Sequence, residues 1–235
     1  MTAAEIVQQL EESAGASYRK ILINHGATEP VLGVKISELK KLQKQFRGNY
    51  PLALELYATG IYDAQYLAGL ITDDAQMTKR DLNGWLTKAN CPVISGSIVA
   101  WVAAESRYGM ELALKWIDSK KAAAAQAGWM TLCSFVSITP DTELNLPELR
   151  QLLHRVQETV HSQTDIVRYA MNSYVISIGC YVCELSEEAV SAAEDIGTVS
   201  VEMGNTACQV PDAVAYINKV RQRGAIGKKR KTAKC

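Results

Sequence analysis

The chain has 235 residues, of which 48% are hydrophobic and 21% charged, and its acidic and basic side chains are equal in number. This composition is typical of a globular protein and excludes a disordered chain. There is no run of about eighteen uncharged apolar residues, and the first residues lack the basic segment and apolar core of a secretory signal. We therefore expect a cytoplasmic protein that does not span a membrane.

The neutral total conceals an asymmetric distribution of charge. Residues 216–235 contain eight basic side chains and no acidic one, which leaves 17 basic against 25 acidic side chains in the rest of the chain. The sequence thus consists of an acidic body followed by a basic C-terminal segment. Such a segment favours contact with a polyanion, because each neutralised phosphate releases counterions; a solvated chain end is the alternative interpretation.

Apolar residues recur at helical spacing along almost the whole chain, and the segments between them are short. Ser37 and Asp63 are expected to cap the helices that follow them, and Pro147 is expected to begin one. The predicted helices lie, in chain order, in residues 1–27 (two short ones), 37–46, 49–57, 63–71, 82–89, 90–104, 110–118, 122–137, 147–156, 167–178, from 186 onward, and 214–220.

The segment from Thr78 to Ala104 is the central helix pair of this prediction. In its first half, Trp85 belongs to an apolar stripe with the spacing of one helix face. Asn90 is expected to end that helix and to cap the next one, whose first turn accommodates Pro92 because the N–H groups there have no intrahelical acceptor.

One segment departs from helical periodicity. Between residues 198 and 210, Val199, Val201 and Met203 alternate with polar residues, and Gly204 and Asn205 could reverse the chain. This pattern predicts a short β-hairpin near 198–210.

Many short helices and hardly any strand leave a closed bundle or a stacked array of antiparallel helix pairs as the possible folds. Each pair takes roughly forty residues, a period typical of HEAT-type repeats, so we favour the array. We expect residues 1–223 to form one HEAT-like α-solenoid domain and residues 224–235 to form a basic C-terminal tail.

The second half of the chain contains segments that resemble a known family. They are Val167-Arg-Tyr-Ala-Met-Asn172, Ile178-Gly179, Ile196-Gly197, Met203-Gly-Asn-Thr-Ala-Cys208 and Gly224-Ala-Ile-Gly-Lys-Lys-Arg-Lys231, with Gly33-Val34 and Ala127-Gly-Trp129 earlier. Together they resemble the AlkD-like proteins, a bacterial branch of the DNA alkylation repair family. The resemblance implies a right-handed superhelix of HEAT-like helix pairs whose concave basic face holds duplex DNA.

In active members of this family, the resemblance implies excision of cationic N3- or N7-alkylated purines, an activity of the DNA-3-methyladenine and 7-methylguanine glycosylase type. Such bases are already good leaving groups, so a carboxylate beside aromatic faces could stabilise the cationic sugar. The family signature Trp-Asp, followed shortly by a catalytic Asp, falls here on Cys91, Pro92 and Ser95. The resemblance therefore implies a related protein that lacks the catalytic carboxylate, unless Asp81 or Glu105 supplies the charge from a neighbouring position.

Several residues are candidates for DNA contact. Trp85 and Lys88 lie close together on one predicted helix, and Lys228, Lys229, Arg230 and Lys231 form a cationic run in the tail. Each Trp sits on an apolar stripe, so core packing is the alternative role of Trp85. Arg168 could either meet a phosphate or cap and pair within the solenoid.

The sequence does not indicate a cofactor or a metal site. Cys180 and Cys183 form a C-x-x-C pair, but a tetrahedral zinc site needs four ligands and no second pair completes it. Two functional classes remain: a DNA-binding relative of alkylation repair glycosylases, whose partner would be duplex DNA, and a non-enzymatic helical scaffold that binds another protein.

Overall fold

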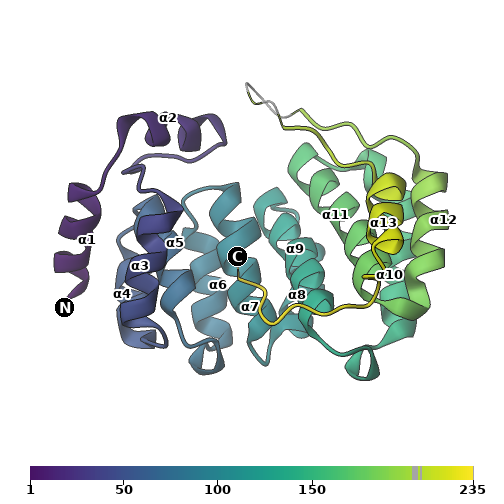
Figure 1. The fold of residues 1–235 in the computed structure, drawn as a ribbon, viewed down its shortest axis with the longest axis horizontal. Helices are drawn as coiled ribbons and strands as arrows, with labels where there is room; N and C mark the ends of the chain where they lie inside the picture. The colour runs from purple at the N-terminus through teal and green to yellow at the C-terminus, as the bar shows by residue number, and fades with distance from the viewer. Residues whose placement is uncertain (203–205, 207, 235) are drawn as a thin grey trace. The chain divides into compact units, whose positions relative to one another are not determined.

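The computed structural model describes residues 1–202, 206 and 208–234. In this part of the chain thirteen α-helices are joined by short turns, which confirms the all-α prediction (Figure 1). The helices are α1 (Ala3–Glu12), α2 (Ala16–Asn24), α3 (Ile36–Phe46), α4 (Tyr50–Ala58), α5 (Tyr62–Ile71), α6 (Lys79–Lys88), α7 (Ala100–Glu105), α8 (Gly109–Ile117), α9 (Ala122–Ile138), α10 (Leu146–Thr159), α11 (Asp165–Tyr181), α12 (Ser186–Ile196) and α13 (Ala213–Gln222). None of the described helices is long and apolar enough to cross a membrane.

The described residues divide into two compact units. The first consists of residues 1–108 together with Thr206 and Lys234, and the second of residues 109–202 and 208–233. Each unit has its own set of packed helices.

In the second unit the helices pack as two rows. Helices α9, α11 and α13 form one row, the α9–α11–α13 row, in which α11 contacts both α9 and α13. The α8–α10–α12 row covers one side of it, with α8 on α9, α10 on α11, and α12 on both α11 and α13. Consecutive helices therefore alternate between the rows, as in HEAT-like helix pairs.

Two aromatic side chains lie at the centre of this unit. The rings of Trp129 on α9 and Tyr174 on α11 meet edge to face, with centroids 5.2 Å apart, and both side chains are almost fully buried. The Tyr174 hydroxyl donates a hydrogen bond to the Leu149 carbonyl of α10 (3.0 Å), so the polar end of the ring is satisfied inside the core.

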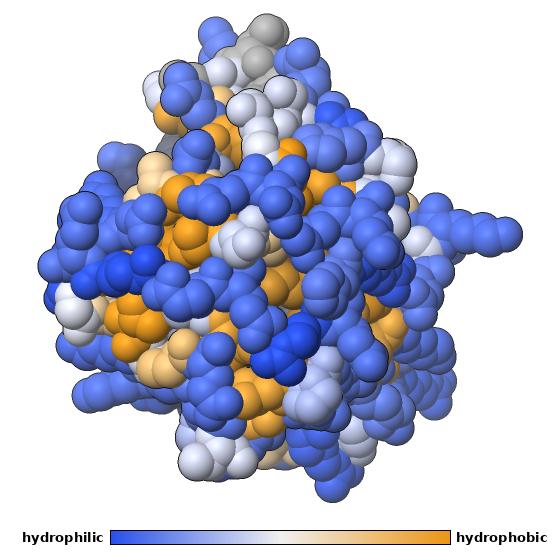
Figure 2. Space-filling model, turned by 90° about the vertical axis from the view of Figure 1, so that its right-hand side faces the viewer, coloured by the Kyte–Doolittle hydropathy of each residue, from blue (hydrophilic) through white to orange (hydrophobic). Residues whose placement is uncertain are grey.

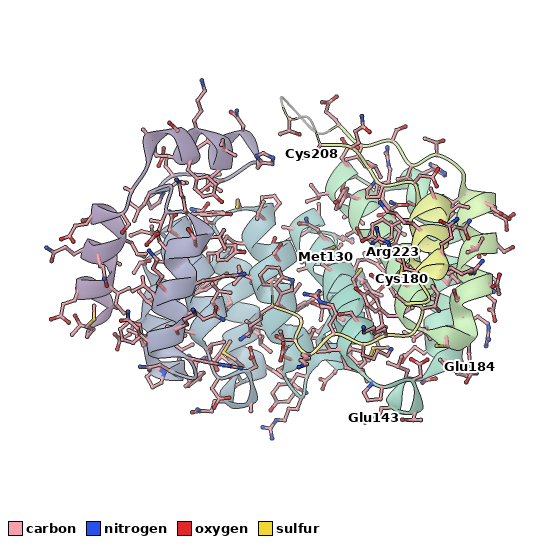
Figure 3. The ribbon with its side chains drawn as sticks, in the orientation of Figure 1. Met130, Glu143, Cys180, Glu184, Cys208 and Arg223 are labelled. Carbon is pink, nitrogen blue, oxygen red and sulfur yellow. The ribbon has the colours of Figure 1, made fainter. Side chains whose placement is uncertain are left out.

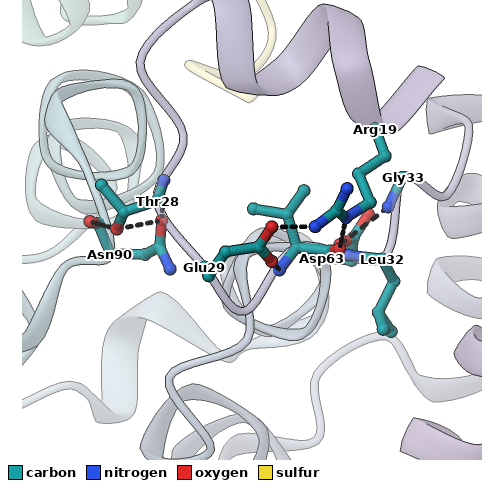
Figure 4. Close-up of polar contacts among 8 residues, drawn as sticks. Arg19, Thr28, Glu29, Leu32, Gly33, Asp63 and Asn90 are labelled. Carbon is teal, nitrogen blue, oxygen red and sulfur yellow. Dashed lines mark hydrogen bonds and ion pairs between the residues drawn. The ribbon is translucent and has the colours of Figure 1, made fainter. Parts of the chain in front are cut away.

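The first unit is organised around α5, in which every residue is buried. Asp63 in its first turn was expected to cap the helix, and this prediction is wrong. The Asp63 carboxylate instead accepts hydrogen bonds from the backbone N–H groups of Leu32 (2.7 Å), Gly33 (3.3 Å) and Val34 (2.7 Å), as Figure 4 shows in part. A buried carboxylate is stabilised by such N–H donors, so Asp63 fixes the segment before α3 onto α5.

Gly33 shows why that segment has its particular sequence. Its φ angle is +82°, and a Cβ atom there would lie 2.5 Å from the backbone nitrogen of Arg19. Only glycine fits this conformation and this close approach. The predicted cap at Ser37 is also wrong, because α3 begins one residue earlier, at Ile36, and Lys35 precedes it without a side-chain cap.

Helix α6 ends at Lys88, two residues before Asn90, and Asn90 does not cap the next helix as expected. Its side-chain oxygen accepts a hydrogen bond from the N–H of Thr28 (3.0 Å), and its side-chain amide donates to the Gly60 carbonyl (3.1 Å). Figure 4 shows the pairing with Thr28. Asn90 therefore connects three loops of the first unit, a long-range role that local capping rules do not anticipate.

The described residues of the segment 198–210 form no strand, and the expected turn residues, Gly204 and Asn205, lie outside the described part of the chain. Near its start, Val199 is buried against the core of the second unit. The Ser200 carbonyl accepts a hydrogen bond from the Arg168 guanidinium (2.6 Å). The backbone at Ser200, which was predicted to belong to a strand, is thus hydrogen-bonded to a side chain of helix α11.

Candidate nucleic-acid interface

The central turn that was expected to contain the catalytic position leads into an unusual helix. Residues 92–93 are helical, residues Ile94–Val99 form a π-helical segment, and α7 continues from there. Such π segments are rare and occur frequently at functional sites. Ser95 is buried in this segment with 1% of its surface exposed. Its hydroxyl donates to the carbonyl oxygen of Pro92 (3.2 Å), so its nearest polar neighbours are backbone oxygens.

The two substitute carboxylates have different surroundings. Asp81 closes a capping box with Thr78 at the start of α6, and the Tyr50 hydroxyl donates to it (2.8 Å). Although burial acts to raise it, the hydrogen bonds from Thr78 and Tyr50 hold the pKa of Asp81 below its ordinary value. Asp81 is therefore an ionised helix cap. Glu105 ends α7, where its charge acts on Asp74.

The structure brings Trp85 and Lys88 together on the wall of one groove. The groove has a volume of about 260 Å³ and lies between α4 and α6, and Arg80 and Gly84 also line it. The Trp85 ring is 4% exposed and stacks on Tyr57, with centroids 4.0 Å apart and an angle of 5° between the planes. The groove is thus lined by the buried Trp85, by the positive charges of Arg80 and Lys88, and by the negative charge of Asp81.

Arg168 is engaged within the second unit. Its guanidinium donates to the carbonyl oxygens of Ser200 (2.6 Å) and Gln163 (2.9 Å), and it lies 3.6 Å from the carboxylate of Asp165. Of the two roles expected for this residue, these contacts are those of the structural one: Arg168 pairs within the unit and ties the start of α11 to the segment at Ser200.

The tail runs over the C-terminal ends of two helices in the second unit. The Lys229 ammonium donates to the carbonyl oxygens of Val136 at the end of α9 (2.8 Å) and Tyr181 at the end of α11 (2.7 Å). It also pairs with Asp141 at 2.7 Å. Helix C-termini carry unpaired carbonyls and partial negative charge, so a buried cation there stabilises both helices.

The tail backbone follows the same pattern. The N–H of Gly227 donates to the Cys180 carbonyl (2.9 Å), and the N–H of Arg230 donates to the Ser137 carbonyl (2.8 Å). Lys228 and Lys231 are exposed, whereas Lys229 and Arg230 are partly buried. The four consecutive cations of the sequence thus divide into two that face solvent and two that pack on the helix ends.

Lys234 has an equivalent position in the first unit. Its ammonium lies 2.7 Å from the Asp74 carboxylate and donates to the Thr72 carbonyl, which follows the end of α5, at 3.4 Å. Burial raises the pKa of Asp74 to about 6, against the opposing effect of the Lys234 charge. The Asp74 carboxyl group therefore binds its proton more tightly in the folded chain than in the unfolded one.

We expect this carboxyl group to make stability depend on pH. Because its pKa is raised on folding, its contribution is most favourable below about pH 4 and is lost as the pH rises through about 6. The free energy of unfolding of the wild type, minus that of Asp74→Asn, should fall by about 2–3 kcal/mol between pH 4 and pH 7. Urea unfolding of both proteins at several pH values measures this difference. A difference that grows with pH would contradict the assignment.

The C-x-x-C cysteines lie at the end of α11 in different environments. Cys180 is buried, and burial raises its pKa to about 11, whereas Cys183 is exposed. The tail packs closely on Cys183, since a Cβ atom on Gly227 would lie 2.1 Å from its sulfur.

In Figure 3, Cys208 lies at one end of the second unit, and Glu143 and Glu184 lie at the other end, on the connections that follow α9 and α11.

The tertiary structure separates charges that the sequence mixes. The α8–α10–α12 row contains seven acidic residues, four of them on α12, whereas the α9–α11–α13 row contains only Asp165. The face of the second unit in Figure 2 shows hydrophobic residues as separate patches between hydrophilic ones. The α8–α10–α12 row thus carries seven of the fourteen acidic side chains in residues 109–235, and the α9–α11–α13 row carries one.

Helix α13 is a surface that the sequence did not indicate. Lys219, Arg221 and Arg223 belong to the basic C-terminal segment 216–235 of the sequence, and the structure places the first two on α13 and the third at its end. The absence of any acid between Ala213 and Arg223 was the signal that could have distinguished this helix.

Comparisons with known proteins agree with this architecture. A family model described as "DNA alkylation repair enzyme" matches residues 6–217. Two uncharacterised proteins, from Listeria innocua and Listeria monocytogenes, are each 30% identical to the chain over 230 residues, covering 95% of this chain and 99% of theirs.

One solved structure matches the fold closely. Its TM-score is 0.92, its sequence is 33% identical, and the match covers 100% of both chains. It is described as representing a new family of proteins related to the HEAT-like repeat DNA glycosylases, with affinity for branched DNA structures. The HEAT-like helical repeat expected from the sequence is therefore the fold of this chain.

Proposed function

The chain belongs to the DNA alkylation repair family, and from this premise we propose that it binds branched or otherwise structured DNA without excising bases. The solved relative with affinity for branched DNA is similar over the whole chain, which supports this proposal. The observation that carries it furthest is the nearly acid-free α9–α11–α13 row, because a polyanion approaches a surface without acidic side chains at the lowest electrostatic cost.

The surroundings of Ser95 support the non-catalytic part of the proposal. A glycosylase of this family would need a carboxylate that faces the sugar of the target nucleotide. Ser95 is buried and donates to backbone oxygens, and Asp81 is engaged as a helix cap by Thr78 and Tyr50. Neither group is placed to stabilise a cation that forms outside the protein.

Binding and excision assays on the purified protein test the two parts separately. We expect affinity for a three-way DNA junction to exceed affinity for a blunt duplex of equal length, and both to weaken steeply with salt. We expect no release of methylated purines from alkylated duplex. Release of 3-methyladenine would contradict the non-catalytic assignment. Affinity that does not depend on salt, or no binding to either DNA, would contradict DNA binding and favour the protein scaffold.

Among the cations predicted from the sequence, we assign phosphate contact to Lys88, Lys228 and Lys231. All three side chains are exposed, so each can neutralise a phosphate without losing a structural contact. Changing each to Ala should reduce the slope of log Kd against log salt by about 1, with a similar effect on every DNA tested. Lys115→Ala, which removes an exposed charge from α8 in the acidic row, is the matched control and should leave the slope unchanged. Equal effects of all four variants would contradict the assignment.

A further inference from the structure

Helix α13 presents an aromatic and cationic stripe to solvent. Tyr216 is 48% exposed, and Lys219 and Arg223 are exposed as well. Spacings of three and four residues align them along one side of the helix. At 1.5 Å per residue, the stripe extends about 10 Å along the helix axis from Tyr216 to Arg223. This is the axial length of about three stacked nucleotides.

The other sides of α13 are occupied by packing contacts. Ile217 is fully buried and packs on Gly179 of α11, where an added Cβ would lie 2.4 Å from it. Arg221 pairs with Glu187 of α12 at 2.8 Å. Helical geometry places Arg221 on the opposite side from Tyr216, Lys219 and Arg223. In Figure 3 Arg223 lies on the side of α13 away from α12.

The cations of the stripe differ from Arg221 in their pairing. Within the part of the chain that the structure describes, Lys219 and Arg223 form no ion pair.

We propose that the α13 stripe binds an unpaired segment of a DNA strand, with one base stacked on Tyr216 and the adjoining phosphates held by Lys219 and Arg223. This inference rests on the proposed function and specifies which part of a branched DNA the second unit recognises. An exposed tyrosine followed by two cations fits a single strand better than a paired one, because a base in a duplex is already stacked on both faces. Stacking tolerates any base, so the stripe selects for strand structure and not for sequence.

The test uses the full-length protein, a three-way junction with an unpaired 2-aminopurine at the branch point, and a blunt duplex of the same length. For the wild type we expect binding to quench the 2-aminopurine fluorescence. Tyr216→Ala should weaken junction binding by about 5- to 150-fold and remove the quenching, since stacking of one base contributes about 1–3 kcal/mol. Binding to the blunt duplex should change by less than about twofold.

Two further variants separate stacking from charge. Tyr216→Phe keeps the aromatic face and should bind the junction as the wild type does. Lys219→Ala and Arg223→Ala should each reduce the salt slope by about 1 on the junction, whereas Lys115→Ala should not. Far-UV circular dichroism and thermal unfolding verify that all variants are folded.

The outcomes distinguish this inference from the proposed function. If the wild type binds neither DNA, the proposed function fails and the stripe has no such ligand. If the wild type binds the junction and Tyr216→Ala binds it equally well with the same quenching, the stripe assignment is overturned and DNA binding stands. If Tyr216→Ala weakens the junction and the duplex equally, recognition of an unpaired base is overturned.

Discussion

Changing Ser95 to Asp is expected to destabilise the protein by about 4 kcal/mol at pH 7 without producing glycosylase activity. Ser95 is 1% exposed, and its hydroxyl donates to the Pro92 carbonyl oxygen. An Asp there would place a carboxylate against a backbone oxygen in an apolar interior. Full burial raises a carboxyl pKa by about 3 units or more, and each unit corresponds to 1.36 kcal/mol at a pH above the shifted value.

The sign of this effect follows from the raised pKa. The destabilisation should be largest at neutral pH and should shrink as the pH falls toward 4, because the carboxyl is then protonated in the folded chain and increasingly protonated in the unfolded one. Ser95→Asn is the matched control, since Asn has the size of Asp without its charge. The difference between the free energies of unfolding of the two variants, measured in urea at pH 5 and pH 8, gives the cost of the buried charge.

Two results would contradict this prediction. If Ser95→Asp is as stable as Ser95→Asn at every pH, the position is accessible to water in solution. If Ser95→Asp also excises methylated purines, the site retains the geometry of an active relative. The wild type would then be inactive only because it lacks the carboxylate.

The second large effect is expected for Lys229→Met, which should lower the free energy of unfolding by about 3 kcal/mol. Met preserves the length of the side chain but removes the ammonium group. The buried carbonyl oxygens of Val136 and Tyr181 and the carboxylate of Asp141 then lose a common donor. Breaking a buried ion pair costs about 3–5 kcal/mol, and we take the lower end because the Lys229 and Asp141 side chains are 18% and 28% exposed.

Lys228→Met and Lys231→Met are the controls for this variant. Both side chains are exposed neighbours in the same tail, so each change should alter the free energy of unfolding by less than about 0.5 kcal/mol. A stable Lys229→Met protein with reduced DNA affinity would assign Lys229 to phosphate contact and contradict the structural role. For the same reason, deletion of residues 224–235 is a poor test of DNA contact, since it also removes Lys229.

The periodic apolar positions were sufficient to predict the helices. Helices α8, α9 and α11 lie where the sequence predicted them, because a stripe spaced by three and four residues forms the same buried face whatever its partner. The HEAT-like repeat followed from short helices with short connections, and the family from local segments such as residues 167–172.

Capping roles and charge were less predictable. Asp63 and Asn90 are residues of the type, and at the positions, that usually cap helices. In the structure, however, Asp63 binds the N–H groups of residues 32–34 and Asn90 binds Thr28. A short polar side chain accepts hydrogen bonds from any nearby donor, so its partner depends on which loops the fold brings close.

The sequence by itself determined that the chain is helical, which side of each helix is buried, and that the chain resembles alkylation repair proteins. Only the tertiary structure decided what the charges do. It placed Lys229 at the ends of α9 and α11, Lys234 beside Asp74, and seven acidic residues on the α8–α10–α12 row against one on the α9–α11–α13 row. Burial of an apolar face depends on local periodicity, whereas the energy of a charge depends on its distance from other charges and from water, which no local pattern records.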